Sequence, residues 1–177
     1  MAVVGLISAT VFTATAARAL AAGQPSLAGV ADAVVAVGSV AGGLWWGRAA
    51  PAWSTTRSLA RLMSVLGLFS LVAGALDSFW LFTVALAGAG AALAPVYVVA
   101  YQASDHAVAP EEVTEASTWV NTAANLGVSL GAAVAGALVS SHGAHAPSVA
   151  GGAAALVVVA VVIVAAAGAR KPRTIGG

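Results

Sequence analysis

Hydrophobic residues form six long runs along this chain, and short polar segments separate them. The runs cover residues 2–22, 27–47, 59–76, 79–101, 116–139 and 148–167. A helix of about 20 apolar residues crosses the hydrocarbon core of a bilayer. Because backbone groups in lipid need partners within their own segment, continuous apolar runs predict helices, whereas membrane-barrel strands would alternate apolar and polar residues. We therefore expect an all-α membrane protein whose 177 residues form a single six-helix transmembrane domain.

Composition supports this class and excludes several functions. Hydrophobic residues make up 60% of the chain and charged residues 7%, whereas a soluble domain is about 25% charged. The net charge of +1 gives no electrostatic basis for binding nucleic acid. The chain has no cysteine, and its three histidines fall in the connections without a third metal ligand beside them. We therefore expect no metal site, no cofactor and no catalytic residues, and we expect the protein not to be an enzyme.

The distribution of lysine and arginine predicts the orientation. With six alternating spans, all but one of these residues fall on the side of the two termini: Arg48, Arg57, Arg61, Arg170, Lys171 and Arg173. Cations collect on the cytoplasmic side of a membrane. We therefore expect a multi-pass protein of the cell membrane with both termini in the cytoplasm. No basic segment precedes the first run, which argues against a signal peptide there.

Two ionisable residues lie inside the apolar runs. Arg18 is about four residues before the end of the first run, and Asp32 is about five residues into the second. At about 1.5 Å of rise per residue they lie at similar depth, so we expect an ion pair near the outer face. Such a pair either neutralises two charges or serves as a substrate site, a proton site or a gate, because ionisable groups are costly in lipid.

The fifth run carries two stripes at helical spacing. Gly127 and Gly131 recur at every fourth position with Ala135, which favours close packing against another helix. Asn121 and Asn125 belong to the other stripe, and either line a cavity or bond to a neighbouring helix. The complete polar stripe is Thr118, Asn121, Thr122, Asn125 and Ser129.

The fourth run contains Pro95, which is expected to kink its helix because proline removes a backbone hydrogen bond. Gly90, Tyr97 and Tyr101 lie along one face of that helix. Tyr97 either lines a substrate cavity or anchors the helix at the membrane interface. For Tyr101 we expect the interface.

Three segments resemble a known family. They are QPSLAG at 24–29 leading to GSVAGGLWWGR at 38–48, AGAG at 87–90 leading to Pro95, and TEASTWVNTAANLGVSLG at 114–131. On these segments the chain resembles the C-terminal six-helix half of the major facilitator superfamily (MFS), in particular its bacterial drug- and metabolite-efflux members. The resemblance covers essentially the whole chain. Gly47 stands where the family's cytoplasmic loop motif usually has an Asp before its Arg, which is Arg48 here.

The resemblance implies transport of small molecules, most specifically proton-driven efflux by an antiporter of the bacterial inner membrane. In this family two six-helix halves enclose a cavity near the bilayer midplane, so this half is expected to need an N-terminal half or a second copy of itself. Tyr97, Asn121 and Asn125 are then the expected cavity residues, and Arg18 with Asp32 the gate or coupling pair. The alternative is a non-transporting membrane subunit, or a truncated product, that assembles with another carrier.

Overall fold

Six long helices and one short 3₁₀ turn make up the described part of the computed structural model, which covers residues 1–49 and 53–168. All six helices are long and apolar enough to cross a membrane. The expected all-α membrane fold is confirmed. The elements are α1 (Ala2–Ala21), α2 (Leu27–Ala49), α3 (Thr55–Ala75), α4 (Phe79–Asp105), η1 (Pro110–Glu112), α5 (Val113–His142) and α6 (Ala146–Gly168).

Several helices extend beyond the apolar runs that predict them. Helix α3 begins at Thr55, α4 continues to Asp105, and α5 covers Val113–His142. The added turns are polar, because there the helix leaves the hydrocarbon and water can satisfy its side chains. Hydropathy thus marks the segment within lipid, and the helix continues into the interface.

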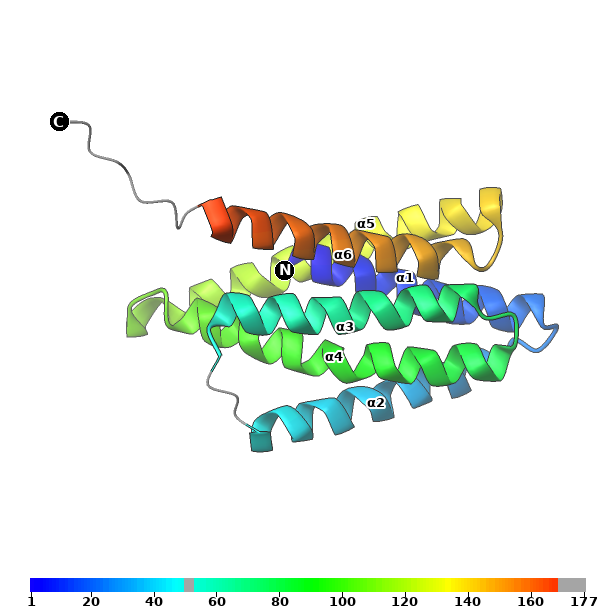
Figure 1. Ribbon diagram of the computed structural model, residues 1–177, viewed down its shortest axis with the longest axis horizontal. Coiled ribbons are helices and arrows are strands. Elements are labelled where there is room, and N and C mark those ends of the chain that lie inside the picture. The colour runs from blue at the N-terminus through cyan, green and yellow to red at the C-terminus, as the bar shows by residue number, and fades with distance from the viewer. Residues whose placement is uncertain (50–52, 169–177) are drawn as a thin grey trace.

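The helices pair mainly with partners that are distant in sequence. Helix α5 packs on α1, α2 packs on α4, and α3 lies against both α4 and α6. Figure 1 shows α5 and α2 at opposite edges of the bundle. Apolar side chains from α1, α3 and α4 fill the space between them and are fully buried, among them Ile7, Val11, Leu66, Phe82, Leu86 and Val96.

Glycines bring both edge helices into backbone contact with their partners. In the α1–α5 pair, a Cβ on Gly127 would overlap the carbonyl group of Ala2, and a Cβ on Gly5 would overlap that of Ala124. Helices α2 and α4 use the same arrangement, with Gly38 against Ala87, Gly42 against Ala91 and Gly90 against Val35. Such small-residue contacts replace the hydrophobic driving force that helices lack in lipid.

A tight cap ends α1 and returns the chain into α2. Gly23 has a φ of 71°, the left-handed region that favours glycine. The N–H of Gly23 donates to the carbonyl of Leu20 at 2.9 Å, and the N–H of Gln24 donates to that of Ala19 at 3.1 Å. This is the Schellman motif. It lets α2 begin at Leu27, so that Asp32 returns to the depth of the last turns of α1.

Candidate functional site

The side chains of Thr15 in α1 and Asp32 in α2 are in hydrogen-bond contact. The hydroxyl oxygen of Thr15 lies 2.7 Å from Oδ1 of Asp32. The same hydroxyl lies 2.7 Å from the carbonyl oxygen of Phe12, one turn earlier in α1. Thr15 is fully buried and Asp32 is partly exposed. The contact therefore holds an acidic group inside a membrane-spanning segment by a hydrogen bond.

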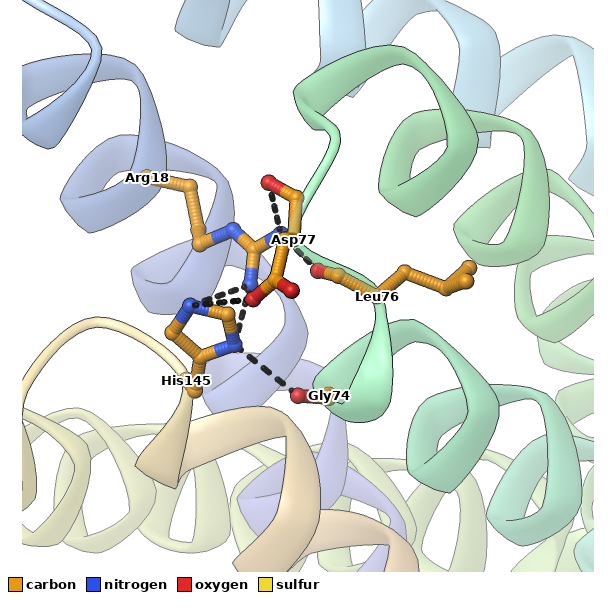
Figure 2. A network of polar contacts seen from close by, with 5 residues as sticks. All are labelled: Arg18, Gly74, Leu76, Asp77 and His145. Carbon is orange, nitrogen blue, oxygen red and sulfur yellow. Dashed lines mark hydrogen bonds and ion pairs between the residues drawn. The ribbon is translucent and has the colours of Figure 1, made fainter.

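Arg18 lies one turn beyond Thr15 and is directed towards the end of α3, as Figure 2 shows. Its Nη2 donates to the carbonyl oxygens of Leu76 and of Asp77, the latter at 3.2 Å. Its guanidinium carbon lies 4.5 Å from the centre of the Phe82 ring. Carbonyls in the last turn of a helix have no N–H partner within it, and they attract a cation. The buried Arg18 thus serves as a cap for α3.

His145, immediately before α6, completes this cluster (Figure 2). Nη1 of Arg18 lies 2.6 Å from Nδ1 and 3.1 Å from Nε2 of the imidazole. Nδ1 is also 3.0 Å from the carbonyl oxygen of Gly74, and Nε2 is 4.0 Å from a carboxylate oxygen of Asp77. A neutral imidazole has one donor and one acceptor nitrogen, so His145 can accept a hydrogen bond from the guanidinium of Arg18 through one of them. One arginine therefore joins the same ends of three helical hairpins.

The expected ion pair between Arg18 and Asp32 is wrong. The two residues lie in neighbouring helices at similar depth, but each has other partners: Arg18 bonds to the end of α3 and to His145, and Asp32 contacts Thr15. The free carbonyls at the end of α3 bind the guanidinium in place of the carboxylate. In the structure, Arg18 and Asp32 thus have separate partners.

Two of the residues in these contacts, Thr15 and His145, were not among the sequence candidates. A signal for Thr15 exists in the helix geometry. Counted from the helix ends at about 1.5 Å per residue, Thr15 lies about 9 Å deep, Asp32 about 7.5 Å and Arg18 about 4.5 Å. Thr15 is therefore closer in depth to Asp32 than Arg18 is. His145 has no comparable signal, because it lies 127 residues from Arg18 along the chain.

The polar stripe of α5 lies on the exposed side of that helix. Asn121 and Asn125 are both exposed, as are Thr118, Thr122 and Ser129. Gly127 and Gly131 are buried on the opposite side, where a Cβ on Gly131 would lie 2.5 Å from the carbonyl oxygen of Leu6 in α1. The helix thus presents hydrogen-bonding side chains away from its own bundle.

Tyr97 lies in the C-terminal half of α4, two residues after the buried Pro95. It is half-buried and packs against the apolar core. Gly90 lies on the side of α4 that faces α2, where it packs against the backbone of Val35.

Aromatic and basic residues gather where α2 ends and α3 begins. Arg48 is exposed in the last turn of α2. The ring centres of Trp46 and Trp53 are 6.0 Å apart, and the guanidinium of Arg61 lies 3.9 Å from the Trp53 ring centre. Tryptophan and arginine in this combination are typical of a membrane interface. The remaining basic residues used for orientation, Arg170, Lys171 and Arg173, lie outside the described residues.

Within residues 1–49 and 53–168, no three His, Asp or Glu side chains come together in a way that could hold a metal ion.

Comparison with protein families gives one finding. A family model described as Major Facilitator Superfamily matches residues 1–176. Comparisons with curated proteins and with solved structures gave no match.

Proposed function

Because the chain belongs to the Major Facilitator Superfamily, whose members transport small molecules and are not enzymes, we propose that it is the C-terminal six-helix half of a proton-driven exporter. Its substrates in this proposal are small amphipathic molecules. Tyr97, Asn121 and Asn125 line the substrate cavity, and Asp32 supplies an acidic group within the membrane.

The observation that carries this proposal is the exposed polar stripe of α5. Five hydrogen-bonding side chains on one helix face are costly in contact with lipid, so this face needs a protein partner or a water-filled cavity. The buried glycines on the other side fix which face is turned outwards, because α5 can approach α1 closely only there. A cavity lined by amides and hydroxyls suits a substrate that has both apolar and polar parts.

A second six-helix body would cover this face. It is either an N-terminal half or a second copy of the chain. Two copies related by a twofold axis along the membrane normal would place α2 of one copy opposite α5 of the other. Arg48 at the inner end of α2 and Glu115 in the first turn of α5 are both exposed and carry opposite charge. This complementarity supports such a pairing.

In this proposal the protein lies in a bacterial inner membrane with both termini in the cytoplasm. The exposed Arg48 and Arg57 and the stacked Arg61 and Trp53 all lie at the end of the bundle assigned to the cytoplasm. Arg18 is the one basic residue described at the other end, and there the backbone of α3 engages it.

Transport into proteoliposomes tests the function. The purified chain is reconstituted at a density that permits pairing, with an acidic lumen and ethidium outside as the probe. We expect ethidium to accumulate and to be released when nigericin removes the pH gradient. Replacing both Asn121 and Asn125 by Val removes two hydrogen bonds of about 1 kcal/mol each, a loss of roughly thirtyfold in rate.

Ser140→Ala is the matched control, because this exposed hydroxyl on α5 bonds only to the carbonyl of Gly136 in its own helix. It should leave the rate unchanged. Equal rates for the double Asn variant and the wild type would contradict the cavity assignment.

The second candidate is a non-transporting subunit that binds another carrier. The exposed apolar face of α2 favours it, since Val37, Leu44 and Trp45 are each more than half exposed. Absence of ethidium accumulation, together with a stable complex with a second membrane protein, would select this alternative.

A further inference from the structure

If Asp32 is ionised, the Thr15 hydroxyl has one hydrogen for two hydrogen-bond contacts. A threonine hydroxyl carries a single hydrogen. Its oxygen nevertheless lies 2.7 Å from two other oxygens, the carbonyl of Phe12 and Oδ1 of Asp32. Both distances are typical of O–H···O hydrogen bonds. A carboxylate and a carbonyl are both acceptors, so an ionised Asp32 would leave one of the two contacts without a hydrogen.

A proton on Asp32 supplies the missing hydrogen. The carboxyl O–H then donates to the hydroxyl oxygen of Thr15, and the Thr15 hydroxyl donates to the carbonyl of Phe12. We propose that Asp32 holds a proton in this conformation and that Thr15 is the positioning residue that receives its hydrogen bond. This inference rests on the proposed function of proton-driven export. It gives this six-helix half an acid that can take up and release one proton.

The charged groups around Asp32 agree with a neutral carboxyl. Helix α2 packs against α1 and α4. From α1 the only ionisable neighbour is Arg18, whose guanidinium is bound to the end of α3 and to His145. The outer part of α4, residues 79–96, contains no ionisable side chain. An ionised carboxyl at this depth would thus have no cation to pair with, and an unpaired charge is costly in lipid.

Loss of the proton would change the bonds of Thr15 in a defined way. The proton leaves Oδ1 of Asp32, and the Thr15 hydroxyl turns from the carbonyl of Phe12 to the new carboxylate. One proton is released, and one hydrogen bond moves from the α1 backbone to α2. The contact between α1 and α2 thereby changes with the protonation of Asp32.

Infrared spectroscopy of the full chain in lipid bilayers at pH 7 tests this directly. The spectrum of the Asp32→Asn variant is subtracted from that of the wild type. The other five acidic residues, Asp77, Asp105, Glu111, Glu112 and Glu115, are all exposed. We expect one carbonyl band of a protonated carboxyl group that shifts in D2O and is absent in Asp32→Asn. Asp77→Asn should leave this band in place.

Variants of Thr15 test the positioning role. Thr15→Val removes the hydroxyl, so the band should move to the higher frequency of a carboxyl group without that hydrogen bond. Thr15→Ser restores the hydroxyl and should return the band to its original position. A wild-type spectrum without the Asp32 band overturns the proposal, and so does a band that Thr15→Val does not move.

The spectroscopic test requires no transport, so the two proposals can fail separately. An Asp32 band in a chain that moves no ethidium would leave the protonated acid standing and refute the exporter. Ethidium transport without the band would refute the protonated acid and leave the exporter standing.

Discussion

Gly127→Ala adds one methyl group at the closest contact between α5 and α1. The new Cβ would lie 2.6 Å from the carbonyl carbon of Ala2 and 2.9 Å from its Cα, whereas ordinary contacts begin at 3.4 Å. Both neighbours are backbone atoms, so no side-chain rotation relieves the overlap. The carbonyl oxygen of Ala2 would lie closer still, so the helices must separate by more than the difference between 3.4 and 2.6 Å, which is 0.8 Å. Overpacking of this kind costs about 1–3 kcal/mol in the free energy of unfolding.

Gly136→Ala on the same helix is the matched control, because no atom lies within 4 Å of the position where its Cβ would be. Both variants gain the same higher helix propensity, so the difference between them isolates the steric effect. Unfolding in mixed micelles with increasing dodecyl sulfate, followed by tryptophan fluorescence, gives both free energies. We expect Gly127→Ala to be less stable than Gly136→Ala by about 1–3 kcal/mol. A difference below about 0.5 kcal/mol would refute the close packing of α1 on α5.

Two further predictions concern the contacts of Arg18 and Asp32 and the orientation of the chain in the membrane. Arg18→Ala should lower the free energy of unfolding by about 2–3 kcal/mol, because it removes charged hydrogen bonds to the end of α3; Asp32→Asn should change it by less than about 1 kcal/mol, since an amide can still donate to Thr15. Equal losses in a denaturation series would instead indicate that the two residues act as a pair. A single cysteine at Asp77 should react with an impermeant maleimide added to intact cells, and one at Ser54 only after permeabilisation. The native chain has no cysteine to give background, and the reverse labelling pattern would show that the termini lie outside.

The hydrophobic pattern predicts all six helices because lipid imposes one rule on every segment within it: backbone groups must be satisfied locally. The same pattern does not predict where the helices end. Helix α4 continues to Asp105 and α5 begins at Val113, where water accepts polar side chains and hydropathy no longer distinguishes helix from loop.

Contacts between particular side chains are harder to predict. Hydropathy and rise per residue give the depth of Arg18 and Asp32, but not which neighbour each side chain faces. A long arginine can reach several helices, and here the carbonyls at the end of α3 attract it. Its second partner, His145, belongs to a different hairpin. Such a contact depends on how non-adjacent helices pack, and periodicity within one segment carries no information about that.

The bond between Arg18 and His145 has a consequence for synthesis. The two residues are 127 positions apart in the chain. At about 5–20 residues per second, a ribosome needs roughly 6–25 s to make the residues between them. During that interval Arg18 has already left the ribosome, and α5, the main packing partner of α1, is still incomplete. Until His145 is made, the end of α3 is the partner that Arg18 has, and the last hairpin to be synthesised completes the cluster.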